Sequence, residues 1–288
     1  MSEQKVVLVT GANKGIGKAI VKEILKRADT VVFLGSRDET RGKAAIAEIE
    51  RESPEVRKRV HLLLVDVTDV DSIARAAEEV RTFLSQQDLS LYGLVNNAGV
   101  GFSEEMKKVL TVNTLGPKRV CDAFLPLLMR PGGRVVNISS ASGPNFLSQA
   151  SEELCQSLRD PEVSWEKIEG IVDKAIASEG RFGGGNAYGL SKALVNAYTI
   201  YLARENEELL INACTPGFIE TDLTRQMARQ RGSSPEEMGM KPPKEGAKSA
   251  LLLLFGDPGG SGWYFGSDGL RSPLDRYRAP GDPPYEGR

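Results

Sequence analysis

Short apolar runs alternate with amphipathic helical stretches along this chain, and the alternation limits the folds it can adopt. The helical stretches carry an apolar stripe, as at Ile16, Ile20 and Ile24. Strands that are apolar on both faces and separated by helices predict a parallel sheet covered on both sides, a doubly wound α/β fold of the Rossmann type. We expect strands at 5–10, 30–35, 60–66, 91–97, 134–139 and 210–215, a short last strand at 263–266, and helices at 14–27, 39–52, 70–84, 104–129 and 187–206.

The length of 288 residues predicts a single domain over 1–288, and the chain has no internal repeat. An insertion at about 141–186 interrupts the alternation, because a short loop would suffice between its flanking strand and helix. We expect helical pieces at 152–159 and 165–177 within it, and a flexible glycine run at 183–185. The proline-containing stretch at about 271–288 predicts an irregular or mobile tail.

Composition excludes several classes of function. A net charge of −2 gives no global attraction to nucleic acid or anionic membranes, and the longest purely apolar run, 251–255, is far too short to span a bilayer. Three cysteines far apart in sequence predict neither a disulfide framework nor a metal site. Together with a strand that begins almost at the N-terminus, leaving no room for a signal peptide, they predict a cytoplasmic protein.

His61 is the only histidine, and it opens a strand-like run. A structural role is therefore expected for it. A single histidine argues against a Ser-His-Asp triad and against a histidine-ligated metal, so acid–base chemistry has to come from other side chains.

The segment TGANKGIG at 10–17 joins the first predicted strand to the first helix. Glycines let the backbone turn sharply, and the free N–H groups at a helix N-terminus can hold a pyrophosphate. The spacing is G-x3-G-x-G rather than G-x-G-x-x-G, and such turns also occur for chain geometry alone. Its position between strand and helix favours a dinucleotide site formed by Gly11, Asn13, Lys14, Gly15, Ile16 and Gly17.

The end of the second strand distinguishes between the cofactors. A carboxylate about 20 residues beyond the glycines would accept the ribose hydroxyls of NAD. Here the strand ends in Ser36 and Arg37, and the first acid is Asp38. Since Arg37, Arg41 and Lys14 can surround a 2′-phosphate, we expect NADPH/NADP.

Tyr188 and Lys192 lie four residues apart on the predicted helix 187–206 and therefore share one face. Ser139 and Ser140 end the preceding strand at the carboxyl edge of the sheet, where a hydroxyl can meet the tyrosine. The group suits reduction of a carbonyl: Ser140 orients the oxygen and Tyr188 protonates it. We expect the Lys192 ammonium to lower the tyrosine pKa from about 10.

Together these residues resemble the short-chain dehydrogenase/reductase family over about residues 5–265. Its long-insertion members, the carbonyl reductases and the plant monoterpenoid and alkaloid ketone reductases, are the most similar. The resemblance rests on ordered motifs: TGANKGIG at 10–17, Asp66-Val67, Asn96-Asn97-Ala98-Gly99, Asn113, Ser140, Tyr188 with Lys192, and Pro216-Gly217.

The resemblance implies a role for each matching residue. Lys192 would also hold the nicotinamide ribose, and Asn113 would support a proton-relay water to that lysine. On the cofactor, Asp66 and Val67 would contact the adenine and Asn97 a ribose. Pro216 and Gly217 would lie in the cofactor site, with Ile219 and Thr221 at the carboxamide.

The insertion departs from most of the family, since 47 residues separate Ser140 from Tyr188. In the carbonyl-reductase-like members a similar insertion packs where others dimerise, so a monomer is implied. Assigning Ser140 rather than Ser139 as catalytic follows the register of the motif.

The substrate is expected to be a small ketone, aldehyde or quinone. Its apolar walls could come from Phe146, Leu147, Trp165 and Phe182 of the insertion and from Met227 and Met238, although each of these is individually more typical of a core residue. Two alternatives stay open: a β-ketoacyl-carrier reductase, which the segment 216–221 also resembles, and a non-catalytic NADPH-binding sensor or scaffold on the same fold.

Overall fold

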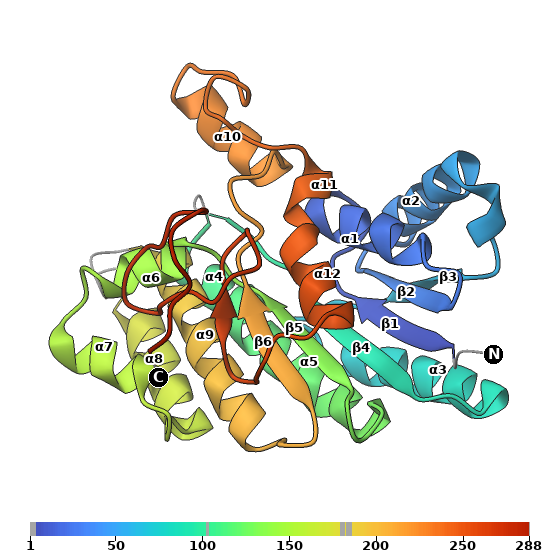
Figure 1. The fold of residues 1–288 in the computed structure, drawn as a ribbon, viewed down its shortest axis with the longest axis horizontal. Helices are drawn as coiled ribbons and strands as arrows, with labels where there is room; N and C mark the ends of the chain where they lie inside the picture. Colours follow the sequence, from blue (N-terminus) through green and yellow to red (C-terminus); the bar gives the residue numbers. More distant parts are fainter. Residues whose placement is uncertain (1–3, 102–103, 179–181, 183–185, 288) are drawn as a thin grey trace.

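The computed structural model describes residues 4–101, 104–178, 182 and 186–287. Its centre is a seven-stranded parallel sheet of order β3-β2-β1-β4-β5-β6-β7, which confirms the predicted doubly wound α/β fold (Figure 1). The predicted strand bounds agree with the structure to within two residues. The strands are β1 (Lys5–Val9), β2 (Thr30–Ser36), β3 (Val60–Leu64), β4 (Leu91–Asn96), β5 (Arg134–Ile138), β6 (Leu210–Cys214) and β7 (Tyr264–Phe265).

Helices cover both faces of this sheet. One core contains buried residues of α1, α2 and α12, and the other contains those of α3, α5 and α9. The helices are α1 (Gly15–Leu25), α2 (Glu39–Glu52), α3 (Val70–Gln87), α4 (Met106–Leu110), α5 (Gly116–Phe124), α6 (Ser142–Leu147), α7 (Glu152–Arg159), α8 (Trp165–Ala177), α9 (Ala187–Arg204), α10 (Asp222–Gln230), α11 (Pro243–Gly246) and α12 (Lys248–Phe255).

The predicted helical stretch at 104–129 is divided in the structure. A π-helical turn, Thr111–Leu115, lies between α4 and α5, and a 3₁₀ turn, Leu125–Leu127, follows. Such π-helical turns occur frequently at functional sites. This one carries Asn113, a candidate catalytic residue.

The strand order reverses between β1 and β4, which lie side by side although three α-helices and two strands separate them in sequence. In a doubly wound sheet, right-handed crossovers send the connections on the two sides of this point to opposite faces. A ligand cleft therefore opens at the carboxyl edge of the strands there. All seven residues of β2 are buried, which explains why its sequence shows no alternation of polar and apolar residues.

Helix α9 is buried on nearly every side because the insertion packs on it. Ile168 and Val172 of α8 share a core with Leu194 and Tyr198 of α9. The ring of Trp165 lies 5.7 Å from that of Tyr198. Phe146, Leu147, Trp165 and Phe182 all pack in or against this core and are not among the residues that line the cleft. This confirms that they are core residues rather than substrate walls. The glycine run 183–185 lies outside the described residues.

The single histidine and the cysteines occupy structural positions. The ring of His61 lies 5.6 Å from Phe33 and 5.1 Å from Phe83, and burial lowers its pKa. All three cysteines are free and buried. Within the described residues, no group of acidic, histidine and cysteine side chains is arranged to bind a metal ion, and no helix has the length and apolarity of a membrane span.

Candidate active site

The glycine spacing of the first turn follows from backbone geometry. Gly11 and Gly15 have φ angles of 62° and 56°, in the left-handed region that favours glycine. A Cβ on Gly17 would lie 2.4 Å from the Nδ2 atom of Asn97 and 2.6 Å from the carbonyl oxygen of Gly11. Asn97 in turn donates from Nδ2 to that carbonyl oxygen (3.0 Å) and to the carbonyl oxygen of Thr10 (2.9 Å), so the turn has a fixed shape.

This turn leaves the N-terminus of α1 open to a cleft of about 1390 Å³. The N-cap residue, Lys14, has an extended backbone and makes no side-chain hydrogen bond to the first turn of the helix. The amide groups of that turn can therefore bind an anion. Asn13, Gly15 and Ile16 line the cleft here, so the local geometry fits a pyrophosphate.

The far end of the same cleft lies at the end of β2, where Arg37 is exposed. The carboxylate of Asp38 caps α2 by accepting a hydrogen bond from the backbone N–H of Arg41 (2.9 Å), and it lies 3.4 Å from the Nε atom of that arginine. Asp66 accepts hydrogen bonds from the N–H and hydroxyl of Thr68. Asp38, the acid nearest to the end of β2, is thus engaged as a helix cap.

Lys14 has a partner that its sequence position does not suggest. Its Nζ atom lies 2.6 Å from the Oδ2 atom of Asp222, at the start of α10, and this hydrogen bond is the largest cause of a lowered pKa for Asp222. A Cβ on Gly15 would lie 3.6 Å from the Cγ2 atom of Thr221. The segment that leads into α10 therefore crosses the cleft above the glycine turn.

The two serines at the end of β5 point in different directions. Ser139 is buried, and its hydroxyl donates to the backbone carbonyl of Lys192 (3.2 Å). Ser140 lines the cleft and is hydrogen-bonded to the side chain of Tyr188. It also accepts a hydrogen bond from the backbone N–H of Ser142 (3.1 Å). The geometry places Ser140, and not Ser139, beside the phenol.

Tyr188 and Lys192 share one face of α9, as their spacing predicts. The Nζ atom of Lys192 lies 5.6 Å from the centroid of the Tyr188 ring and donates to the carbonyl oxygen of Ile138 (2.8 Å). Lys192 is 6% exposed, and burial lowers its pKa to about 8.

The expected net lowering of the Tyr188 pKa is not what this structure shows. Burial raises the pKa of the phenol, and the hydrogen bond with Ser140 only partly opposes this effect. The ammonium group is directed to the Ile138 carbonyl, so desolvation dominates.

Asn113 connects the π-helical turn to α9. Its Oδ1 atom accepts from the N–H of Val100 (2.9 Å), and its Nδ2 atom donates to the carbonyl of Val100 (3.0 Å) and the hydroxyl of Ser191 (3.1 Å). That hydroxyl donates to the carbonyl oxygen of Tyr188 (2.8 Å). Asn113 therefore fixes the turn of α9 that carries Tyr188 and Lys192 without itself lining the cleft.

The strand β6 leads into the opposite rim of the cleft. Gly217 has a φ angle of 89°, and a Cβ there would lie 3.0 Å from that of Ser267. Thr221 caps α10 through a reciprocal pair of hydrogen bonds with Thr224. The structure brings all the predicted cofactor residues to one cleft with Ser140, Tyr188 and Lys192: Gly11, Asn13, Lys14, Gly15, Ile16, Gly17, Arg37, Arg41, Asp66, Val67, Asn97, Pro216, Gly217, Ile219 and Thr221.

Sequence reasoning missed the C-terminal wall of this cleft. Tyr264 of β7 and Arg276 and Tyr277 of the tail line it, whereas the tail was expected only to be irregular or mobile. The run Arg-Tyr-Arg at 276–278 is the signal that could have indicated this role. Of the two methionines considered as substrate walls, Met227 lines the cleft, and Met238 is not among its lining residues.

Comparison with known proteins agrees with this architecture. The short chain dehydrogenase family matches residues 5–151. Carbonyl reductase [NADPH] 1 of Rattus norvegicus is 34% identical, covering 91% of this chain and 94% of the rat protein. Menthone neomenthol reductase from Mentha piperita superposes with a TM-score of 0.74 at 25% identity, covering 92% of this chain and 99% of that chain.

An NADPH-bound carbonyl reductase from chicken fatty liver is also similar, with a TM-score of 0.66 and 25% identity, covering 94% of this chain and 99% of that chain. The family match spans half of the chain, and the rat protein aligns with nearly all of it at more than 30% identity. On these grounds the chain belongs to the short-chain dehydrogenase family.

Proposed function

We propose that this protein reduces a small ketone, aldehyde or quinone to an alcohol with NADPH, and that Tyr188 supplies the proton. One observation carries the proposal: the Tyr188 phenol is hydrogen-bonded to Ser140 and stands beside the buried Lys192, in the cleft that also contains the glycine turn. The relatives named carbonyl reductase [NADPH] support the same reaction and cofactor.

The residues present fit the cofactor. The uncapped N-terminus of α1, with Asn13 to Gly17, binds the pyrophosphate, and the cations Lys14, Arg37 and Arg41 bind the 2′-phosphate. When bound, the nicotinamide supplies the hydride. The remaining cofactor contacts that we propose are Asp66 and Val67 with the adenine, Asn97 with a ribose, and Pro216, Gly217, Ile219 and Thr221 around the carboxamide.

The phenol and the Ser140 hydroxyl handle the carbonyl oxygen. Negative charge develops on this oxygen as the carbon is reduced, and both hydroxyls can donate to it. Because burial raises the pKa of Tyr188, the phenol stays protonated at neutral pH. It keeps its proton until the far more basic alkoxide forms and then donates it.

Lys192 and Asn113 restore the proton and hold the geometry. With a pKa of about 8, Lys192 is a cation at neutral pH, and it stabilises the phenolate once the proton has left. It would also hold the nicotinamide ribose when the cofactor is bound. Hydrogen bonds to Ser191 and Val100 hold Asn113 in place, and Asn113 would support a water that returns a proton toward Lys192.

We further propose a single-domain, cytoplasmic monomer. Helices α7 and α8 of the insertion cover α9, so this helix has little surface left for a second copy. Three free, buried cysteines suit a reducing compartment. The β-ketoacyl-carrier reductase and the non-catalytic sensor are not favoured, because the relatives are carbonyl reductases and the reacting side chains are all in place.

The test is a turnover assay with purified protein, NADPH and a panel of quinones, aldehydes and cyclic ketones, followed by absorbance of the reduced nicotinamide. Carbonyl-dependent NADPH oxidation is expected. Tight NADPH binding without oxidation by any member of the panel would instead support the sensor.

Arg37→Ala tests the choice of cofactor. Loss of a charge-assisted hydrogen bond, worth about 1.5–3 kcal/mol, is expected to weaken NADPH binding roughly 10- to 100-fold and to leave NADH binding unchanged. Arg51→Ala, at an exposed arginine of α2 outside the cleft, is the matched control. Equal losses for NADPH and NADH would remove the argument for the 2′-phosphate.

A further inference from the structure

The C-terminal tail, residues 271–287, is irregular as expected, but it is anchored to the body of the protein. Its first anchor is Arg278, whose side chain is 6% exposed and forms an ion pair with Asp268. The same guanidinium donates to the hydroxyl of Ser272 (3.0 Å) and to the carbonyl of Asp282 (2.7 Å). Burial alone would raise the pKa of Asp268, but hydrogen bonds from Arg278, Leu270 and Gly281 outweigh it and lower that pKa.

A second anchor joins the tail to the insertion. Asp275 lies 2.8 Å from Arg159 of α7 and 3.1 Å from its neighbour Arg276. The guanidinium of Arg271 lies 4.1 Å from the centroid of the Trp263 ring. The backbone carbonyl of Arg271 accepts a hydrogen bond from the N–H of Tyr285 (2.9 Å). The tail is thus fixed on both sides of the segment 276–277.

Between these anchors the tail presents Arg276 and Tyr277 to the cleft that contains Tyr188 and Ser140. The Arg276 side chain is 61% exposed and Tyr277 is 53% exposed, so both are accessible. The buried Tyr264 of β7 lines the same cleft, so Tyr188, Tyr264 and Tyr277 all face one cavity.

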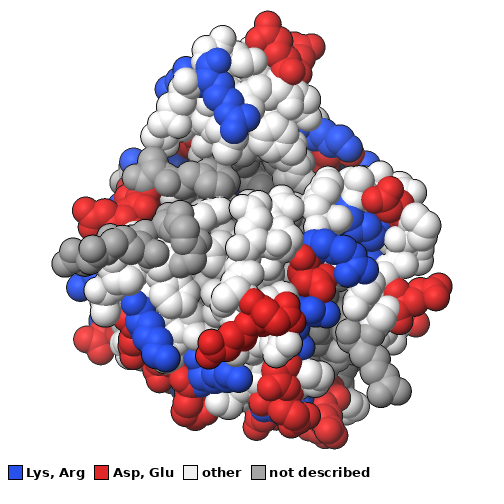
Figure 2. Space-filling model, turned by 90° about the vertical axis from the view of Figure 1, so that its left-hand side faces the viewer, with Lys and Arg blue, Asp and Glu red and all other residues white. Residues whose placement is uncertain are grey.

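The charges on this wall are not balanced. Asp275 neutralises only one of the two arginines that it contacts, which leaves one positive charge on the group of Arg159, Asp275 and Arg276. Among the described tail residues that line the cleft there are two arginines and no carboxylate, and the charge of Arg278 is compensated by Asp268. Uncharged residues occupy most of the centre of the face turned toward the viewer in Figure 2.

We propose that Arg276 and Tyr277 form a substrate-recognition site that selects carbonyl compounds carrying an aromatic ring and a carboxylate. The guanidinium of Arg276 can hold a carboxylate through two parallel hydrogen bonds, and the ring of Tyr277 offers a flat surface for an aromatic group. The proposal rests on the proposed carbonyl reduction and adds a class of substrate to it.

Two probes that differ only at one substituent test this site: 4-formylbenzoate and its slightly larger, neutral methyl ester, reduced by the full-length protein with saturating NADPH. Wild type is expected to favour the acid by about tenfold in kcat/KM, the effect of one charge-assisted contact. Arg276→Gln should bring the ratio close to one by raising KM for the acid, with kcat and the ester unchanged. Tyr277→Ala should lower kcat/KM for both probes.

Controls separate recognition from folding. Arg276→Lys keeps the charge and should retain part of the preference, and Arg51→Gln should retain all of it. Added salt should raise KM of wild type for the acid and not for the ester, which tests the charge without any substitution.

Each contrary outcome has a distinct meaning. If both probes are reduced and their ratio is the same in Arg276→Gln as in wild type, the recognition site is wrong and the proposed function stands. The recognition site is also wrong, and the proposed function stands, if the protein reduces cyclohexanone, a neutral aliphatic ketone, but neither aromatic probe. Failure to oxidise NADPH with all three compounds overturns the proposed function and the recognition site together.

Discussion

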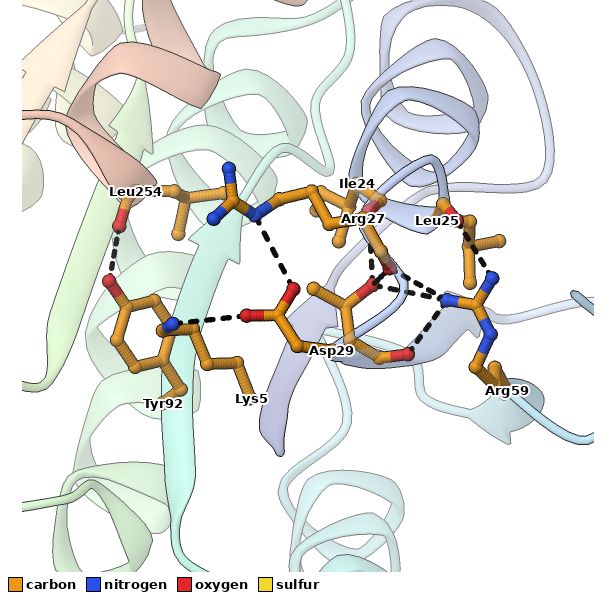
Figure 3. A network of polar contacts seen from close by, with 9 residues as sticks. Lys5, Ile24, Leu25, Arg27, Asp29, Arg59, Tyr92 and Leu254 are labelled. Carbon is orange, nitrogen blue, oxygen red and sulfur yellow. Dashed lines mark hydrogen bonds and ion pairs between the residues drawn. The ribbon is translucent and has the colours of Figure 1, made fainter. Parts of the chain in front are cut away.

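The carboxyl and amino edges of the sheet both hold charged side chains, but burial affects the charges at the two edges differently. At the amino edge, the charges pair with one another or with backbone carbonyls, as Figure 3 shows. At the carboxyl edge, Lys192 is buried, with the carbonyl of Ile138 as its described hydrogen-bond acceptor. The same sheet therefore uses charge for stability at one edge and holds it ready for chemistry at the other.

Arg59 is the centre of the amino edge. Its guanidinium donates to the carbonyl oxygens of Leu25 (2.9 Å), Arg27 (2.8 Å) and Thr30 (3.1 Å), and so joins the last residue of α1 to the turn after it and to the start of β2. Close by, Lys5 donates to Asp29 (3.2 Å).

Ring contacts extend this network. The Tyr92 hydroxyl donates to the carbonyl of Leu254 (2.8 Å), and its ring stacks on Phe255 with centroids 5.8 Å apart. Lys5 and Arg27 lie over these two rings, at 5.4 and 4.5 Å from their centroids. Burial would raise the pKa of Asp29, but its hydrogen bond with Lys5 and the nearby positive charges lower it. Paired charges at this edge stay charged.

Lys192 shows the opposite behaviour. Burial lowers its pKa from 10.5 to about 8, which means that the fold disfavours its charged form. A shift of this size corresponds to about 3 kcal/mol of differential stabilisation. The reacting edge is therefore maintained at a cost in stability.

The sharpest test of this difference is Lys192→Met. Loss of the ammonium is expected to reduce turnover roughly 10²- to 10⁴-fold, as for other proton-transfer groups. The free energy of unfolding at neutral pH should not fall, because the relief of a burial penalty of about 3 kcal/mol at least matches the loss of one charge-assisted hydrogen bond, worth about 1.5–3 kcal/mol. Turnover assays and urea denaturation measure the two effects, and a clear loss of stability would contradict the comparison.

Arg59→Met should have the reverse effect. The carbonyls of Leu25 and Thr30 lose this donor, and the carbonyl of Arg27 keeps the Thr30 hydroxyl. The free energy of unfolding is therefore expected to fall by about 2–4 kcal/mol, while kcat of the folded fraction stays at the wild-type value. Urea denaturation and NADPH oxidation again give the two values.

Lys5→Gln is the matched control within the same network. Its pair with Asp29 is partly exposed, with side chains 29% and 20% exposed, and its removal should cost less than about 1 kcal/mol. Equal losses for Arg59→Met and Lys5→Gln would show that carbonyl capping is not what stabilises this edge.

The dependence on pH gives the smallest effect. Reductive kcat/KM is expected to be flat at neutral pH and to fall, by at most about tenfold per pH unit, above the Lys192 pKa of about 8. The free energy of unfolding changes in the opposite direction to activity. Between that pKa and the unfolded value of 10.5, the unfolded chain binds the proton that the folded chain has lost, so the free energy of unfolding rises with pH. A pH–rate profile beside thermal melts checks both, and activity that rises through this range would contradict the assignment.

Much of the site was predictable because it depends on local geometry. The positive φ angles of Gly11 and Gly15 require glycine, and the spacing of Tyr188 and Lys192 fixes a shared helix face. The strands were predictable for a similar reason, since burial on both faces leaves continuous apolar runs such as β2.

The features of the site that could not be predicted depend on contacts between distant segments. Lys14 and Asp222 are 208 residues apart, and nothing local in either segment indicates their pairing. The direction of the Tyr188 pKa shift follows from how deeply the surrounding chain buries the phenol, a property that the i, i+4 spacing does not contain. The anchored tail belongs to the same class, because Arg278 acts through Asp268 and Ser272.

The most direct measurement of the central claim is Tyr188→Phe, with NADPH affinity from fluorescence titration and kcat from carbonyl reduction determined on one preparation. The cofactor is held mainly by other residues, so its Kd should stay within about twofold of wild type, while kcat falls roughly 10²- to 10⁴-fold because the proton donor is gone. Turnover at the wild-type rate would contradict the assignment of Tyr188 as the proton donor.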